Sequence, residues 1–459
     1  MISFPGYDDI IKKVYEEKQE HVFRFWDAID DNKKKSLLED LKNVNFEEIN
    51  RQYLNASTEP VIDEDYGPAD YIRLPRNPEE SAKFAQARET GVEAIKKGRV
   101  CAFIVAGGQG SRLGYDGPKG AFPFTPIKHK SLFQVFSEKI LKSSKIYGVS
   151  IPLLIMTSHA NHQQTKEHFE QNKYFGLDPE NVFMFQQDMI PSLTTSGKLI
   201  LASQNSLFRN PNGHGGSLIA LKKSGMLQKL KEKGIDLISY FQVDNPIVCA
   251  IDPVFIGFHI LNNAEISSKA LTKAYPQEKV GNFVIFPGKK LGIVEYSDLP
   301  EDKAYEKESD GSLHYSAGNV AIHIFSVDFI SKITSDDFSL PYHLAEKKIL
   351  AYNNGEPEKI DGYKFEKFVF DALPLTDKNV ILETSRRNEF APVKNKTGLD
   401  SVDSSRQLMM DMHREWLEKR GIEIPDSVAI IEISPLKALR AEDLDKDIII
   451  PDQSEVYLD

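Results

Sequence analysis

Strand-forming and helix-forming segments alternate along residues 100–245, and this alternation is the feature that most limits the fold. Near-continuous apolar runs of strand length occur at 100–106, 152–158, 181–187 and 235–245. Helix-period segments separate these runs. An apolar run between two helices is typical of a strand that is covered on both faces, as in a parallel sheet. The sequence therefore predicts an α/β fold with a doubly wound, Rossmann-like sheet.

The segments outside this alternation predict smaller parts at the two ends of the chain. Residues 1–97 carry apolar side chains at helical spacing among many charges, with a turn-rich link at 60–78. From about residue 266 the strands lie closer together, which indicates an antiparallel extension and hence a mixed sheet. We predict a helical N-terminal segment at 1–97, a central domain at 98–393 and a small C-terminal domain at 394–459.

Charge and cysteine content exclude several kinds of partner. The 459-residue chain carries 57 Lys and Arg against 68 Asp and Glu, a net charge of −11, so it offers no broad basic face to a nucleic acid. Residues 1–17 lack the apolar stretch of a signal peptide, and no run of about 18 apolar residues occurs. Cys101 and Cys249 lie in apolar runs, which is typical of thiols in a reducing compartment. We expect a cytoplasmic protein, a monomer or weak homo-oligomer, with neither nucleic acid nor membrane as partner.

A glycine-rich loop, VAGGQGSRLGYDGPKG at 105–120, follows the first predicted strand. It fails the dinucleotide pattern G-x-G-x-x-G, because Leu113 stands where the third glycine belongs, and it fails G-x-x-x-x-G-K-[ST], because no Ser or Thr follows Lys119. The strand at 152–158 also lacks the terminal acid that binds a ribose. Bare amides can still bind phosphate oxygens, with Arg112 as a forked donor and Lys119 as a point charge. The loop predicts a triphosphate site of another kind; a solvated surface loop is the alternative.

Polar residues also follow two later strands. QQDM at 186–189 ends the third predicted strand, and VDN at 243–245 ends the fourth. Ligands of doubly wound sheets bind beyond the carboxyl ends of the strands, so these stretches are expected to lie beside the glycine loop. Asp244 could hold Mg²⁺ against phosphates, since magnesium favours one or two carboxylates with phosphate and water. Asp-Asn-Pro is equally a good turn, and the residues alone leave both interpretations open.

Seven blocks in order resemble a known family. The glycine loop is similar to the pattern L-x-G-G-x-G-T-x-x-G-x-x-x-P-K of the eukaryotic-type UTP-dependent sugar-1-phosphate uridylyltransferases, with Val105 and Ser111 in place of Leu and Thr. The later blocks are FQQDMIPSL, QVDNP, VEYS, SAGNVAIHIF, EKFVFDAL and SRRNEFAPVKN, within about residues 100–396. The resemblance implies a nucleotidyltransferase whose catalytic domain, 98–393, transfers uridylyl from UTP to N-acetylglucosamine 1-phosphate and releases pyrophosphate. It also implies Mg²⁺ as cofactor, with Mn²⁺ as a substitute.

Elementary chemistry agrees with this activity. The second pKa of a sugar phosphate lies near ~6, so its attacking oxygen is ionised at neutral pH without a general base. The obstacle is the repulsion between two polyanions, which placed cations and a metal can overcome. The sequence offers cations in the glycine loop and no evident Ser-His-Asp triad.

The resemblance assigns roles to matching positions. The positions that it implies for UTP are Val105, Ala106, Gly107, Gly108, Lys119, Gln187, Gly213, Asp244 and Lys364, with Asp244 also the metal ligand. The positions that it implies for the sugar are His214, Glu295, Tyr296, Asn319, Phe368, Phe370 and Lys394. Arg112, Lys119 and Lys394 are expected to be catalytic, Lys394 by stabilising charge on the reacting phosphorus. Phe368 and Phe370 alternate, which predicts that both face one side of a strand.

One position departs from the family. Its G-N-G-G stretch reads Gly213-His214-Gly215-Gly216 here, which resembles the G-H-G of related UDP-sugar pyrophosphorylases. Imidazole can still donate a hydrogen bond. The alternatives are an enzyme for the 1-phosphates of glucose, galactose or N-acetylgalactosamine, a catalytically silent nucleotide-sugar binder, and, more distantly, an oxidoreductase with a distorted dinucleotide loop.

Overall fold

The computed structural model describes residues 1–57, 65–335, 339–353 and 355–459. The chain forms two compact units. We call Met1–Ile62, Gln187–Gly216 and Leu340–Val369 the smaller unit, and Asp63–Gln186, Ser217–Ser339 and Phe370–Asp459 the larger unit. This grouping follows contacts and leaves the division at residues 97 and 393 a prediction.

A mixed sheet forms the centre of the larger unit, with ten strands among the described residues. Four neighbouring strands are parallel, in the order β10 (Leu237–Gln242), β2 (Val100–Val105), β3 (Leu153–Thr157) and β4 (Val182–Gln186). On the far side of β10, the antiparallel strand β14 (Ala317–Ser326) continues the sheet. The remaining strands are β1 (Gly67–Pro68), β11 (Ile266–Thr272), β12 (Asn282–Phe286), β13 (Lys290–Val294) and β17 (Asn379–Glu383). The predicted doubly wound mixed sheet is confirmed.

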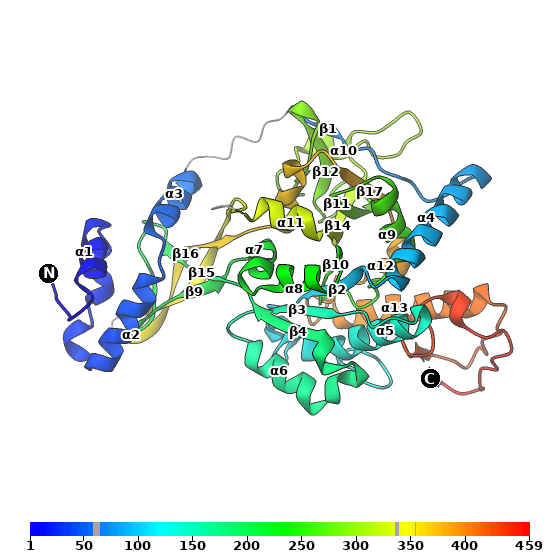
Figure 1. Cartoon of the computed structure of the whole chain (residues 1–459), viewed down its shortest axis with the longest axis horizontal. Helices are drawn as coiled ribbons and strands as arrows, with labels where there is room; N and C mark the ends of the chain where they lie inside the picture. The colour runs from blue at the N-terminus through cyan, green and yellow to red at the C-terminus, as the bar shows by residue number, and fades with distance from the viewer. Residues whose placement is uncertain (58–64, 336–338, 354) are drawn as a thin grey trace. The chain divides into compact units, whose positions relative to one another are not determined.

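Helices cover both faces of the parallel strands (Figure 1). Ala102 and Ile104 of β2 join a core with residues of α4 (Pro78–Lys96), α5 (Leu132–Tyr147), α6 (His162–Gln171), α9 (Pro253–Leu261) and α13 (Val402–Lys419). On the opposite face, Phe103 contacts the ring of Tyr240, and Lys229 of α8 (Met226–Glu232) lies 4.0 Å from the ring centre of Phe183. The order along the sheet reverses between β2 and β10, so their carboxyl ends mark the switch point where ligands bind.

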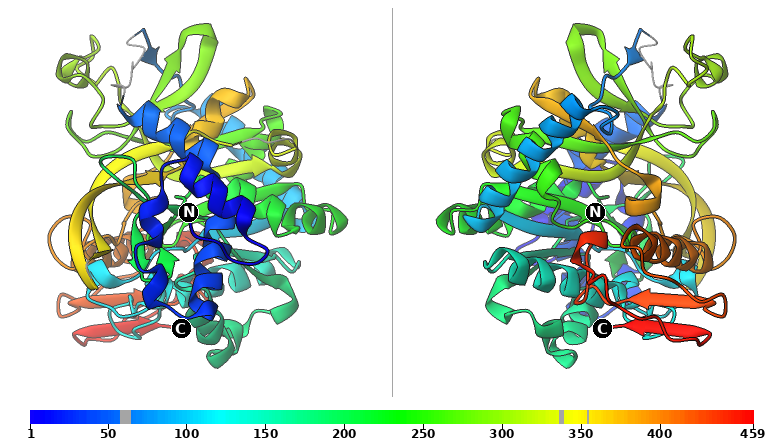
Figure 2. Two further views of the ribbon diagram at one scale, coloured as in Figure 1. Left: turned by 90° about the vertical axis from the view of Figure 1, so that its left-hand side faces the viewer. Right: turned by 90° about the vertical axis from the view of Figure 1, so that its right-hand side faces the viewer.

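The chain after residue 401 packs around α13. The short parallel pair β18 (Ile430–Ile433) and β19 (Glu455–Leu458) is visible in Figure 2. Its apolar side chains form a cluster with Leu417 of α13. The larger unit also contains α7 (Gly216–Lys223, from its second residue on), α10 (Glu301–Tyr305), α11 (Val327–Ile333) and α12 (Arg386–Glu389). Within the described ranges, no helix combines the length and apolar content needed to cross a membrane.

The smaller unit joins N-terminal helices to strands from two later segments. Its helices are α1 (Asp8–Glu16), α2 (Asp31–Lys42) and α3 (Phe46–Ser57). Its strands are β5 (Met189–Pro191), β6 (Leu193–Thr194), β7 (Leu201–Ser203), β8 (Ser206–Leu207), β9 (Arg209–Pro211), β15 (His343–Asn353) and β16 (Glu356–Glu366). Leu38 and Leu41 share one apolar cluster with Leu207 and Phe365, and Arg209 Nε lies 2.7 Å from Asp40 Oδ1. The apolar faces of the N-terminal helices are therefore buried by strands some 150 to 320 residues away in the sequence.

Close packing of α4 against α9 predicts a stability effect. A Cβ atom added at Gly257 would lie 1.7 Å from the carbonyl oxygen of Ala87, so the two backbones must separate to admit it. We expect Gly257→Ala to lower the free energy of unfolding by about 1–3 kcal/mol, measured by denaturant titration. Gly67→Ala, where a Cβ meets nothing within 4 Å, is the matched control. Equal midpoints for Gly257→Ala and wild type would contradict this account of the helix pair.

Candidate active site

The glycine loop follows β2 and contains backbone amides without an acceptor in the described part of the chain. Gly110 N donates to Gly117 O at 2.8 Å and Lys119 N donates to Gly108 O at 3.1 Å, which closes the loop into a hairpin. The amides of Gly107, Gly108 and Gln109 donate to no acceptor among the described residues. Consecutive unpaired amides are what an anion-binding loop needs, and this one lies at the switch point of the sheet.

The two cationic side chains of the glycine loop, Lys119 and Arg112, differ in exposure and in ion pairing. Lys119 is largely covered, with its side chain 16% exposed, and its Nζ lies 3.6 Å from Asp244 Oδ2. The side chain of Arg112 is exposed and forms no ion pair within the described part of the chain. The structure therefore brings Lys119 of the glycine loop to Asp244, as the expected proximity of the two stretches implies, and leaves Arg112 exposed.

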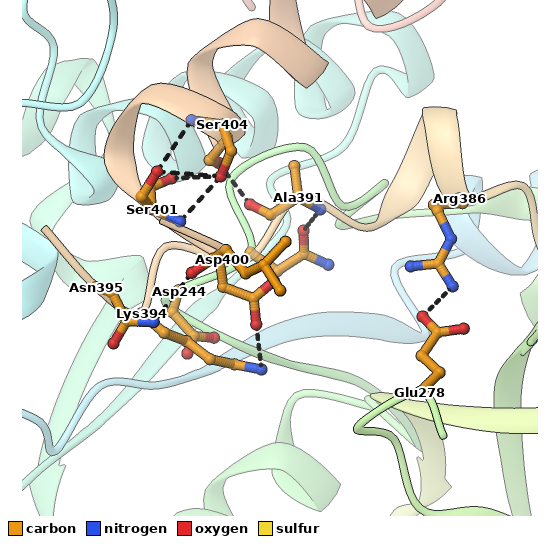
Figure 3. Close-up of polar contacts among 12 residues, drawn as sticks. Asp244, Glu278, Arg386, Ala391, Lys394, Asn395, Asp400, Ser401 and Ser404 are labelled. Carbon is orange, nitrogen blue, oxygen red and sulfur yellow. Dashed lines mark hydrogen bonds and ion pairs between the residues drawn. The ribbon is translucent and has the colours of Figure 1, made fainter. Parts of the chain in front are cut away.

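Lys394 is brought to the same strand end by backbone pairing. Val393 N donates to the carbonyl oxygen of Asp244 at 2.7 Å, and Lys394 Nζ lies 3.2 Å from Asp400 Oδ2 (Figure 3). The amides of Lys394 and Asn395 also donate to Asp400 O. Each of the two lysines therefore has a carboxylate partner that holds its amine beside the strand end where Asp244 lies.

Asn245 is a contributor to this arrangement that sequence reasoning missed. Its buried side chain donates to Glu389 O at 2.6 Å and accepts from Ala391 N at 3.0 Å. The segment that carries Lys394 is thereby tied to the residue after Asp244. In the sequence, Asn245 was interpretable only as part of a turn, because its partners lie about 145 positions away.

Two of the residues expected to bind the sugar, Asn319 and Glu295, lie in the larger unit near Gly281. Asn319 N donates to Gly281 O at 2.8 Å, and its side-chain oxygen accepts from Ala321 N. Glu295 Oε1 lies 3.0 Å from the place that a Cβ of Gly281 would take. Tyr296 follows Glu295 after β13 and is 45% exposed. The structure thus places Glu295 and Asn319 close together, as a shared role requires.

Two of the positions expected to bind UTP, Gln187 and Gly213, lie together in the smaller unit. Asn212 N donates to Asp188 O at 3.1 Å, which places Gly213 beside Gln187. Gln187 is 7% exposed, and its Oε1 has no hydrogen-bond partner among the described residues. A buried amide oxygen without a protein donor can accept a hydrogen bond from a water molecule or from a ligand. Gly213 has φ of +83°, and a Cβ there would lie 2.5 Å from Lys367 O, so glycine is required.

His214 belongs to a small aromatic stack in the same unit. Its Nδ1 accepts from Val369 N at 3.2 Å, and its ring lies on that of Phe368 with centroids 5.3 Å apart. A nitrogen that accepts from a backbone amide is unprotonated, so the hydrogen of a neutral His214 is on Nε2. At the position where the family has asparagine, this chain therefore has an imidazole ring whose hydrogen-bond donor is Nε2.

The expectation that Phe368 and Phe370 face one side of a strand is wrong. Strand β16 ends at Glu366, and Val369–Leu375 form a 3₁₀ helix with Pro374 inside it. Proline lacks the amide that a strand would pair, so the chain turns here. Phe370 is buried and Phe368 is half-buried. Lys364 lies on β16, half-buried, with Nζ 5.8 Å from the ring centre of Phe208; burial lowers its pKa.

The donor set around Asp244 fits a magnesium ion only in part. The described residues contain no group of three His, Cys, Asp or Glu side chains that could hold a metal. Asp244 supplies a carboxylate at the strand end, with its side chain 17% exposed. Such a site suits Mg²⁺ when phosphate oxygens and water complete the shell.

Comparison with known proteins agrees with this geometry. The model of the family described as UTP–glucose-1-phosphate uridylyltransferase matches residues 44–439. UDP-N-acetylglucosamine diphosphorylase 2 of Arabidopsis thaliana is 34% identical over 461 aligned residues, covering 95% of this chain and 90% of that protein. A probable UDP-N-acetylglucosamine pyrophosphorylase of Dictyostelium discoideum is also 34% identical and covers 97% of both chains.

A solved structure shares the whole architecture. The crystal structure of the uridine diphosphate N-acetylglucosamine pyrophosphorylase of Trypanosoma brucei, in complex with inhibitor, has a TM-score of 0.81 and 28% identity, and covers 96% of this chain and 95% of that one. The resemblance carried by the seven sequence blocks is confirmed. The chain belongs to the UTP–glucose-1-phosphate uridylyltransferase family.

Proposed function

We propose that the chain transfers the uridylyl group of UTP to N-acetylglucosamine 1-phosphate and releases pyrophosphate. The observation that carries this proposal is the run of unpaired amides at Gly107, Gly108 and Gln109 beside the Lys119–Asp244 pair, at the switch point of the sheet. Relatives that match nearly the whole chain are named for UDP-N-acetylglucosamine, which selects the sugar.

The reaction needs charge neutralisation more than proton transfer. An oxygen of the sugar phosphate attacks the α-phosphorus of UTP in line, one O–P bond forms, the bond to the β-phosphate oxygen breaks, and pyrophosphate leaves. The attacking oxygen is already ionised, because the second pKa of a phosphate monoester is near ~6. Lys119 would bind the UTP phosphates, Arg112 would supply a forked contact from the exposed side, and Lys394 would stabilise the charge on the reacting phosphorus.

We assign substrate selection to residues in both units, each with a stated role. Gln187 Oε1, buried without a donor, would accept the N–H of the uracil ring beside Gly213. Glu295 and Asn319 would bind sugar hydroxyl groups. The family resemblance also assigns Tyr296, Phe368 and Phe370 to the sugar and Lys364 to UTP. Asp244 would hold Mg²⁺, which supplies neutralisation of phosphate charge when bound; Mn²⁺ prefers the same oxygen ligands.

Release of pyrophosphate tests this function. Purified protein is incubated with UTP, Mg²⁺ and one of four sugar 1-phosphates: N-acetylglucosamine, N-acetylgalactosamine, glucose or galactose. We expect the highest kcat/KM with N-acetylglucosamine 1-phosphate. Release without any sugar would indicate hydrolysis, and saturable UTP binding without release would indicate a silent binder; either result contradicts the proposal.

His214 is expected to influence which sugar is used. His214→Asn removes the ring that lies on Phe368 and replaces a donor fixed by Val369 with a freely rotating amide. We expect the ratio of kcat/KM for the N-acetylglucosamine and glucose phosphates to change about tenfold, with KM for UTP changed less than about twofold. His129→Asn, at an exposed position, is the control. An unchanged ratio would remove His214 from sugar selection.

The proposal also covers the cellular compartment and the oligomeric state of the protein. Cys101 and Cys249 are free thiols, which agrees with a reducing, cytoplasmic setting. We expect a monomer or a weak homo-oligomer, to be measured by sedimentation across a range of protein concentrations.

A further inference from the structure

Asn161 connects the glycine loop to the next strand of the sheet. It follows β3 and directly precedes α6, and its side chain is fully buried, with 0% exposed. Its Nδ2 donates to Ala106 O at 2.9 Å and to Gly108 O at 3.1 Å. Its Oδ1 accepts from Ser158 N at 2.8 Å and from Ser158 Oγ at 3.1 Å. Both donors of the amide and its acceptor oxygen are thereby used.

These contacts determine where the loop amides point. A trans peptide group is planar, and its C=O and N–H point in opposite directions. The carbonyl groups of Ala106 and Gly108 point toward Asn161, so the N–H groups of Gly107 and Gln109 point away from it. Those N–H groups have no acceptor among the described residues. The buried side chain of Asn161 thus orients the N–H groups of Gly107 and Gln109 toward the side of the loop that faces away from Asn161.

The contacts of Asn161 bear on the lack of an acidic residue after β3. In dinucleotide-binding folds the second strand ends in an acid that binds a ribose. Here the corresponding strand is followed by Ser158-His159-Ala160-Asn161, without an acid. An aspartate at residue 161 would place carboxylate oxygens against two carbonyl oxygens. Asn161 therefore donates hydrogen bonds to the glycine loop, whereas the acid of a dinucleotide-binding fold accepts them from a ribose.

We propose that Asn161 is a positioning residue for UTP, which sets the direction of the Gly107 and Gln109 amides through two bonds to loop carbonyl oxygens. The inference rests on the proposed function, because it requires that this loop binds UTP. Asn161 itself lies behind the loop, fully buried, and touches the nucleotide only through the backbone that it holds.

The decisive variant is Asn161→Asp, which keeps the shape and removes the donors when ionised. We expect the dissociation constant for UTP, measured by calorimetry at about pH 8, to rise about tenfold. Burial against carbonyl oxygens raises the pKa of such a carboxyl group. Lowering the pH toward about 6 restores one O–H donor, so the ratio of variant to wild-type dissociation constants is expected to fall with pH. A residue with a merely structural role would give a ratio independent of pH.

Asn161→Ser is a second test that can be used if Asn161→Asp does not fold, because it places no charge in the buried site. Its hydroxyl group is too short to reach both carbonyl oxygens, so KM for UTP is expected to rise about tenfold while kcat changes less than about threefold. Asn172→Asp, an exposed asparagine at the end of α6, is the control and should match wild type.

The outcomes separate this inference from the proposed function. Wild-type protein that fails to bind UTP overturns the proposed function. Wild-type protein that binds UTP, together with Asn161 variants that bind it equally well at every pH, overturns the positioning role alone. A rise in KM for UTP with the expected pH-dependent ratio supports both.

Discussion

Replacing Lys119 with alanine is expected to lower kcat/KM for UTP by about 150-fold, a loss of about 3 kcal/mol of transition-state stabilisation. The side chain is mostly covered and its amine lies 3.6 Å from Asp244, at the carboxyl end of the strand beside the glycine loop. A cation preorganised in a partly water-excluded site stabilises developing phosphate charge more than a solvated one does. The variant also removes the ammonium group that lies beside the Asp244 carboxylate, so the repulsion between this carboxylate and the UTP phosphates increases.

Initial rates of pyrophosphate release measure this effect. Circular dichroism and the denaturant midpoint should show that Lys119→Ala stays folded. Lys145→Ala, which removes an exposed lysine of α5, is the matched control and should keep wild-type kinetics. Wild-type turnover in folded Lys119→Ala would remove this residue from the mechanism.

Asp244→Asn is expected to have the largest effect, a fall in kcat of about 1,000-fold at low Mg²⁺. The substitution keeps the size of the side chain and the backbone bond from Val393 N to the carbonyl oxygen of residue 244. It removes the only carboxylate that we assign to the metal, and an amide oxygen is a much weaker ligand for Mg²⁺. The concentration of Mg²⁺ that gives half-maximal activity should therefore rise.

A magnesium titration at saturating substrates distinguishes a metal ligand from a structural turn. Partial recovery of Asp244→Asn at high Mg²⁺ is the expected result. Asp116→Asn, at an exposed acid within the same glycine loop, is the control and should titrate like wild type. An Asp244→Asn variant with unchanged kcat and unchanged Mg²⁺ dependence would show that the residue only forms the turn.

Features that depend on local pattern could be predicted from the sequence. The four parallel strands lie within about three residues of their predicted bounds, because each is an apolar run flanked by helix-forming sequence. The proximity of the glycine loop, which carries Lys119, to Asp244 followed from the positions of the loop after β2 and of Asp244 after β10. A rule about sheets was sufficient for this, without knowledge of any single contact.

Features that depend on distant contacts could not be predicted in this way. Asn161 and Asn245 are satisfied by carbonyl and amide groups that their own neighbourhoods do not reveal. The burial of the N-terminal helices against β8 and β16 is equally non-local. Phe368 and Phe370 were placed on a strand because alternation is the only signal in that stretch; Pro374 was the available sign that the chain turns into a 3₁₀ helix.

The central claim is that unpaired backbone amides and a few placed cations hold the UTP phosphates at the switch point of the sheet. A crystal structure of the protein soaked with UTP and Mg²⁺ tests it most directly. The account predicts nucleotide oxygens within hydrogen-bond distance of the amides at 107–109, phosphate oxygens in contact with Lys119, and the metal on Asp244. Electron density for the phosphates in any other part of the molecule would contradict it.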